Sequence, residues 1–111
     1  MNVNEQEMLE SITTKVMEWE VEDGSSWIKC PAGLFKKEHL FELWNPLQNI
    51  TDAWRVVEKM IESGYQFELE CKLGEYYARF SKEQPFQWGA AKSATEAICS
   101  AAYKAARGYV Q

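Results

Sequence analysis

The chain has 111 residues, of which 46% are hydrophobic and 26% are charged. This composition is ordinary for a globular protein and excludes global disorder, and the length is enough for one core. No apolar run approaches the roughly 18–20 residues that a membrane-spanning helix needs. The first residues have neither the basic nor the apolar stretch of a signal peptide, so we expect a cytoplasmic protein with a single domain over residues 1–111.

The net charge of −5 is concentrated near the N-terminus, where residues 1–26 hold seven acidic side chains and one lysine. Nucleic-acid binding relies on clustered Lys and Arg, so this distribution predicts no nucleic-acid partner. The acidic side chains are either a solvated helix face or a surface for a basic partner.

The first helix is predicted over residues 4–18. Leu9, Ile12 and Val16 recur there at helical spacing, and acidic residues occupy the first turn, where the helix dipole favours them. The pair Asn4–Glu7 has the spacing of a capping box.

Residues 27–43 follow a Gly-Ser break and show no sustained hydrophobic period. Val21, Trp27 and Ile28 are consistent with a short strand. Residues 36–43 are consistent with either a helical turn or an edge strand. The sequence leaves these alternatives open.

The second helix, over residues 50–63, has the clearest boundaries. Asn49 can cap its start, and Gly64 can end it in the left-handed conformation. The residues expected on its core face are Ala53, Val57, Met60 and Ile61, with Ile50 packing at the start and Trp54 at the border.

After Gly64 the hydrophobic period changes from helical to alternating. Residues 65–73 and 76–81 alternate between apolar and polar side chains across a short turn that contains Gly74. Two alternating runs joined in this way predict an antiparallel β-hairpin. Residues 82–87, with a proline, are predicted to form a loop.

The third helix is predicted over residues 93–107, opened by the capping-box spacing of Ser93 and Glu96. Its expected inner face is unusually small, so we expect it to pack closely on the sheet. The residues of that face are Ala94, Ala97, Ile98, Ala101, Ala102 and Ala105.

The three cysteines lack the close spacing of a disulfide framework or a zinc site. Cys71 and Cys99 fall on the predicted inner faces of a strand and a helix, where a free thiol packs as a small apolar group. Cys30 lies in the irregular segment.

Together these elements predict an α+β fold. A hairpin is too small to stand alone, so its apolar face must be covered by helices. Tyr77 lies on the opposite face from Tyr76, Ala78 and Phe80, and its presence there indicates that the second face is partly covered as well. We therefore expect helices on both sides of a small sheet.

Three segments carry a family resemblance. They are Met17-Glu18-Trp19-Glu20-Val21, Trp44-Asn45-Pro46-Leu47 with the helix that begins at Ile50, and Trp88-Gly89-Ala90-Ala91 with the helix that follows. In this order they resemble the family called phage ABA sandwich domain, small proteins of phages and prophages common among Gram-positive bacteria. The resemblance implies an α-β-α sandwich, a phage or prophage origin and a bacterial host's cytoplasm. It implies no catalytic residue, and residues 30–41 match no pattern of the family.

Motifs for catalysis, phosphate binding or metal binding are lacking in the sequence. His39 is the single histidine and stands among charged residues, so we expect it to be solvated. Glu68 and Glu70 share a strand face, and alternation on a solvated face explains them better than a catalytic pair does. We expect no metal, no cofactor and no enzymatic activity.

The five tryptophans are about three times the ordinary number for this length, and they are the remaining functional signal. Each can be a core anchor. Trp44 and Trp88 lie in loops, where exposed aromatic side chains would suit recognition. We therefore name Trp44, Asn45, Trp88 and Arg79 as the candidate binding surface.

Two functions are consistent with this sequence. The first is a non-catalytic module that binds a host or phage protein or associates with itself. The alternative is a domain that binds or sequesters a small ligand, such as a nucleotide, in a pocket at the sheet edge near Trp44, Trp88 and Arg79.

Overall fold

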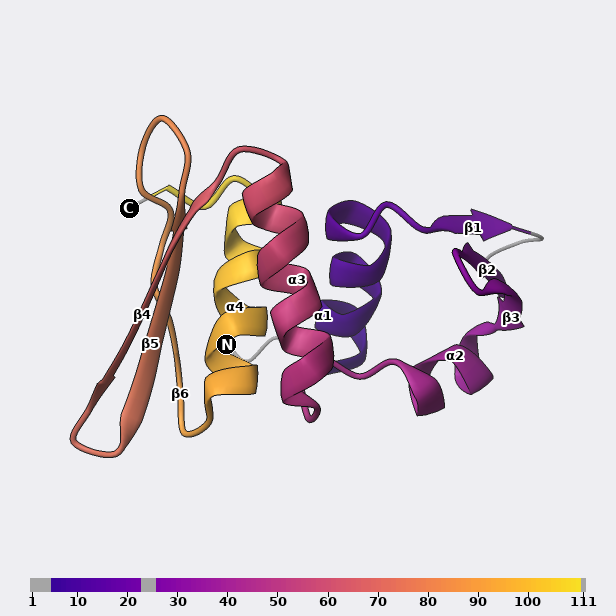
Figure 1. Cartoon of the computed structure of the whole chain (residues 1–111), viewed down its shortest axis with the longest axis horizontal. Coiled ribbons are helices and arrows are strands. Elements are labelled where there is room, and N and C mark those ends of the chain that lie inside the picture. The colour runs from indigo at the N-terminus through magenta and orange to yellow at the C-terminus, as the bar shows by residue number, and fades with distance from the viewer. Residues whose placement is uncertain (1–4, 23–25, 111) are drawn as a thin grey trace.

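The computed structural model describes residues 5–22 and 26–110, and in them it has four α-helices and two three-stranded antiparallel sheets (Figure 1). This confirms the α+β class. The helical elements are α1 (Glu5–Ser11), the π-helix η1 (Ile12–Val16), α2 (Lys37–Leu43), α3 (Ile50–Glu62) and α4 (Ala94–Ala106). The strands are β1 (Glu20–Glu22), β2 (Trp27–Cys30), β3 (Gly33–Lys36), β4 (Gln66–Lys72), β5 (Glu75–Ser81) and β6 (Gly89–Ala91).

The elements are stacked along the long axis of the molecule, which measures 41 × 29 × 27 Å. In Figure 1 the β4–β5–β6 sheet is at one end, followed by the pair α3 and α4, then α1 with η1, and then the β1–β2–β3 sheet with α2. The helices that pack on the β4–β5–β6 sheet all lie on one of its faces.

This arrangement differs from the expectation of helices on both faces. Tyr77, which motivated that expectation, is half-buried by neighbours on its own sheet face. Its hydroxyl donates a hydrogen bond to the Glu75 carboxylate at 3.0 Å, and its ring lines a groove together with Trp88. The hydrogen bond raises the pKa of Tyr77 and lowers that of Glu75.

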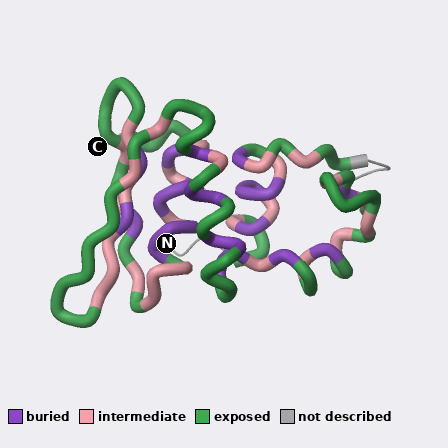
Figure 2. Tube along the Cα trace, in the orientation of Figure 1, coloured by how far each residue is buried: buried purple, intermediate pink, exposed green. Residues whose placement is uncertain are grey.

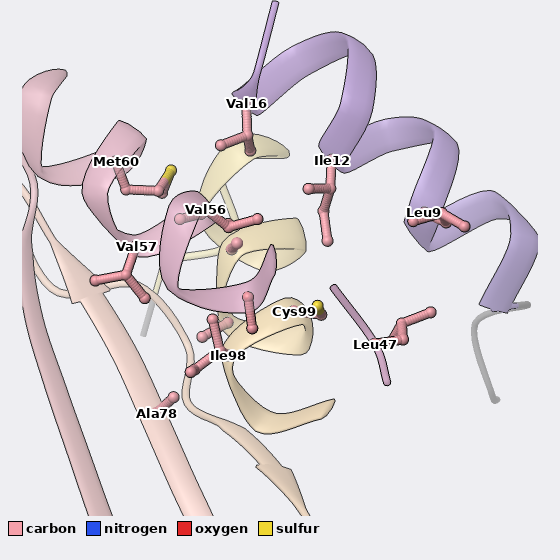
Figure 3. Close-up of a cluster of buried hydrophobic side chains, with 14 of the residues drawn as sticks. Leu9, Ile12, Val16, Leu47, Val56, Val57, Met60, Ala78, Ile98 and Cys99 are labelled. Carbon is pink, nitrogen blue, oxygen red and sulfur yellow. The ribbon is translucent and has the colours of Figure 1, made fainter. Parts of the chain in front are cut away.

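The core lies where α3 and α4 meet η1 and β5 (Figure 3). Val56 and Val57 of α3 are fully buried, and Ile98 of α4 and Ile12 of η1 pack in the same cluster. Figure 2 shows the same distribution, with buried positions gathered on the central helices and exposed positions along the outer half of the β4–β5 hairpin.

The helix predicted over residues 4–18 is present, with a change of geometry at Ile12–Val16. There the hydroxyl of Thr13 donates to the carbonyl of Leu9 at 2.7 Å, and that of Thr14 to the carbonyl of Glu10 at 2.9 Å. These bonds satisfy carbonyls that the next α-helical turn would otherwise use, and such back-bonding bends or widens helices. Asn4, the predicted cap, lies outside the described residues.

The segment left open by the sequence forms two strands and a helix. The predicted strand at Ile28 is β2, in an antiparallel sheet with β1 and β3. Over residues 36–43, the helical alternative is confirmed as α2 (Lys37–Leu43). β3 was not predicted, because its four residues are too few to establish an alternating pattern.

The predicted boundaries of α3 are confirmed. The Asn49 side chain accepts a hydrogen bond from the Asp52 N–H at 3.1 Å, and Gly64 adopts a φ of +99°. Two of its expected core residues, Ile50 and Ile61, are instead 54% and 51% exposed. Helical periodicity gives the direction of an apolar face but not its width, and Val56 is buried in their place.

The hairpin is confirmed in its predicted register, from the pair Gln66–Ser81 to the pair Lys72–Glu75. The prediction that Cys71 is in the core is wrong, since Cys71 is exposed. The tip of the hairpin extends beyond α4 in Figure 1, so the inner face of β4 has no helix over it there.

Close packing of α4 on the sheet is confirmed at Gly89, the first residue of β6. A Cβ atom at Gly89 would lie 2.5 Å from the Ala101 nitrogen and 2.6 Å from the Ala97 oxygen. The predicted cap is also present, with the Ser93 hydroxyl accepting from the Glu96 N–H at 3.3 Å. Ala94 is half-buried rather than buried.

Cys99 is buried in α4, as predicted. Burial raises the pKa of its thiol to about 12, and the nearby Glu96 carboxylate acts in the same direction. Its thiol therefore stays protonated at physiological pH and packs as an apolar group.

Candidate functional site

Trp44 is an anchor of the core. It is 3% exposed, and its indole N–H donates to the Thr13 hydroxyl of η1 at 3.1 Å. Its ring centroid lies 4.9 Å from that of Trp19. The expectation that Trp44 is exposed in its loop is therefore wrong, and the alternative of a core anchor holds for this residue.

Asn45 shapes the turn that leads into α3. Its side-chain oxygen accepts from the Leu47 N–H at 3.1 Å, and its own N–H donates to the Asp52 carboxylate at 3.0 Å. These bonds fix a turn two residues long, the usual use of an asparagine in this position.

Arg79 and Trp88 lie together on the open face of the β4–β5–β6 sheet. The Arg79 guanidinium carbon is 4.4 Å from the centroid of the Trp88 ring, and its Nη2 is 2.7 Å from the Glu68 carboxylate. The structure therefore brings together two of the four predicted surface residues, and it places the other two in the turn before α3. The aromatic ring and the carboxylate both hold the Arg79 cation in place.

A shallow groove of about 590 Å³ lies next to this pair. Its polar walls include Glu70 and Lys72, which form an ion pair at 3.7 Å. The complete lining is Glu70, Lys72, Leu73, Tyr77, Trp88 and Ala90.

A second surface, which the sequence reasoning missed, lies between the outer side of α3 and the inner side of β4. We name it the α3–β4 apolar surface. Trp54 of α3 is 48% exposed, and its ring meets that of Phe67 of β4 edge to face at 6.0 Å between centroids. The exposed residues of this surface are Ile50, Trp54, Ile61, Leu69, Cys71 and Leu73.

One signal in the sequence could have indicated this surface. Leu73 occupies a turn position with a φ of 51°, where Asn or Gly is usual, and its side chain is fully exposed. A large apolar side chain at such a position stabilises nothing within the hairpin itself.

His39 is exposed on α2, as expected. Within residues 5–22 and 26–110, no group of three or more His, Cys, Asp or Glu side chains is placed to hold a metal ion. In that same part of the chain, no helix is both long and apolar enough to cross a membrane.

The fold and these surfaces define a small α+β domain with an exposed apolar surface beside an edge strand. The chain belongs to the phage ABA sandwich domain family, whose model matches residues 10–103. Its structure is similar to the 2.0 Å crystal structure of a phage protein from Bacillus cereus ATCC 14579, with a TM-score of 0.69. The two share 21% sequence identity over 100% of this chain and 94% of the other. The comparison with curated proteins gave no match.

Proposed function

We propose that this phage domain is a non-catalytic protein-binding module that uses the α3–β4 apolar surface. The observation that carries the proposal is the exposure of Trp54, Leu69 and Leu73 side by side with other apolar residues. Contiguous apolar patches on a folded domain mark interaction sites more often than they occur by chance.

The composition of the surface also supports binding of a protein. Tryptophan contributes more to protein interfaces than most residues, because its large ring is buried on contact with little loss of side-chain freedom. Trp54 is already held against Phe67, so little of its motion remains to be lost on binding. The fitting partner is a host or phage protein with an apolar patch of its own.

We expect a Trp54→Ser variant to lose partner binding by about 30-fold or more, the effect of removing a hot-spot residue. The measurement is retention of proteins from the lysate of infected host cells on the immobilised domain. Circular dichroism and the melting temperature of each variant establish that it is folded.

The matched control is Leu43→Ser, which removes a side chain that is 71% exposed on α2, at the far end of the molecule from β4. Proteins retained by the wild type and by the Leu43 variant, but not by the Trp54 variant, support the proposal. An identical set of retained proteins for all three contradicts it.

A second candidate function is binding of a small ligand in the groove beside Trp88. The groove has a volume within the range of ligand sites and offers two aromatic rings, those of Trp88 and Tyr77. Its charges do not favour a nucleotide, since Lys72 is already paired with Glu70, and Arg79 with Glu68. An uncharged aromatic ligand fits these walls better.

If this groove binds such a ligand, a nucleoside or another planar compound raises the melting temperature of the wild type and not that of Trp88→Ala. A thermal-shift panel that includes nucleotides and uncharged aromatic compounds measures this. No shift with any compound at millimolar concentration removes the candidate.

A further inference from the structure

β4 is an edge strand with a regular, unprotected edge. The order of its sheet is β4–β5–β6, so β4 pairs on one side only among the described residues. Its pairing with β5 runs without a bulge from Gln66 to Lys72, and the strand contains no proline. Bulges and prolines are the features by which proteins usually prevent pairing at such an edge.

The turn determines which backbone groups of β4 point outward. Leu73 and Gly74 form a two-residue turn with φ values of 51° and 76°, as in a type I′ hairpin, and the pair Lys72–Glu75 closes it. The closing pair of such a hairpin is hydrogen-bonded, and the bonded pairs then alternate along the strand. The N–H and C=O groups of Leu69 and Cys71 therefore face the free edge.

We infer that the β4 edge pairs antiparallel with β4 of a second copy of this chain, about an axis at Glu70. The inference rests on the proposed protein-binding function and assigns one partner to it. In this register Leu69 lies opposite Cys71 of the second copy, and Glu68 lies opposite its Lys72. The two sheets then form one continuous sheet of six strands.

Charge complementarity favours a second copy as the occupant. The polar face of β4 reads Glu68, Glu70, Lys72, and an antiparallel copy places each end of this pattern against the opposite charge at the other end. Opposite charges directly across a strand pair stabilise it. The two Glu70 carboxylates meet at the centre, where each lies 3.7 Å from the Lys72 amine of its own strand.

Other registers fit less well. An axis at Leu69 places Glu68 opposite Glu70 of the second copy twice, and like charges across a strand pair are destabilising. An axis at Cys71 requires Leu73 to pair, and the left-handed φ of Leu73 takes it out of the strand. An axis at Glu70 also leaves room for both copies, because the hairpin tip extends past α4 (Figure 1).

The first test is a disulfide between copies. Directly opposed residues in a hydrogen-bonded antiparallel pair have Cα atoms about 5.5 Å apart, which is within the range that a disulfide spans. We therefore expect Leu69→Cys, in a Cys30→Ser background, to form a covalent dimer with Cys71 of the second copy under mild oxidation. Non-reducing electrophoresis measures it.

Two controls fix the register. Adding Cys71→Ser to the Leu69→Cys chain abolishes the covalent dimer if Leu69 faces Cys71. The Cys30→Ser chain without a cysteine at position 69 gives none, because Cys71 does not face itself. A covalent dimer that survives Cys71→Ser, or one formed by Cys71 alone, overturns the inferred register.

The second test is the charge pattern in the unmodified dimer. Lys72→Glu replaces two attractive contacts by two repulsive ones, so we expect the dimer dissociation constant in sedimentation equilibrium to rise about tenfold or more. Lys92→Glu is the matched control, since Lys92 is exposed on the same sheet, beyond the last residue of β6. Equal effects of both substitutions overturn the inference.

A wild type that stays monomeric up to about 1 mM overturns the inference as well, a concentration at which even a weak pairing is populated. The proposed function fails by a different result, the unchanged set of retained proteins with Trp54→Ser. The two failures are thus distinguishable, because Trp54 lies on α3 and takes no part in the strand pairing.

Discussion

Replacing Gly89 with alanine is expected to destabilise the domain by about 3 kcal/mol, because the added methyl group has no space. It would lie 2.5 Å from the Ala101 nitrogen and 2.6 Å from the Ala97 oxygen, and both are backbone atoms of α4. Side-chain rotation cannot relieve such contacts, so β6 and α4 must separate. A decrease in melting temperature of about 10 °C or more follows at this chain length, and calorimetry measures it.

Gly74→Ala is the matched control. Gly74 has a φ of +76° and no heavy atom within 4 Å of the position of a Cβ. The substitution therefore adds backbone strain without steric overlap, at a cost of about 1–2 kcal/mol. If Gly89→Ala costs no more than Gly74→Ala, then β6 does not pack against α4 as closely as described.

Trp44→Ala is expected to reduce the free energy of unfolding by about 3–5 kcal/mol, the effect of removing a fully buried tryptophan. This is a large share of the roughly 5–15 kcal/mol that stabilises a typical domain. The substitution leaves a cavity beside Trp19 and removes the donor to the Thr13 hydroxyl. Urea denaturation followed by circular dichroism measures the loss.

Trp88→Ala is the control for this prediction. Trp88 is half-buried on the open sheet face, and its ring contacts the Arg79 guanidinium. Losing that contact costs about 1 kcal/mol. Equal losses for the two tryptophans would show that Trp44 is not the stronger anchor. The intermediate variant Trp44→Phe keeps most of the ring volume and removes the hydrogen bond, worth about 1–2 kcal/mol.

The elements with local signals could be predicted from the sequence. The start of α3 depends on a hydrogen bond from Asp52 to Asn49, three residues away, and its end depends on Gly64. The hairpin depends on alternation across a two-residue turn, and α4 on the pair Ser93 and Glu96. In each case the residues that determine the structure are close together in the chain.

Elements that depend on distant contacts could not be predicted in the same way. β6 has three small residues, and its position depends on the contact of Gly89 with α4. Burial of Trp44 depends on Thr13, 31 residues away. Neither contact leaves a periodic pattern in the sequence.

The candidate site was predicted in part for the same reason. Alternation correctly placed Arg79 on the polar side of β5, and there it contacts Trp88. Alternation also placed Leu69 and Cys71 toward the helices, but it gives no information on where a covering helix ends. The apolar side chains beyond that point became the exposed surface.

The π-helix η1 has a consequence for how lengths can vary in this part of the chain. Deleting one residue within Ile12–Val16 would restore α-helical geometry and rotate everything that follows by about 100°. Trp19 would then turn away from the Trp44 ring, which it meets at 4.9 Å. Any alignment gap placed at this turn therefore implies a different neighbour for the residue equivalent to Trp44.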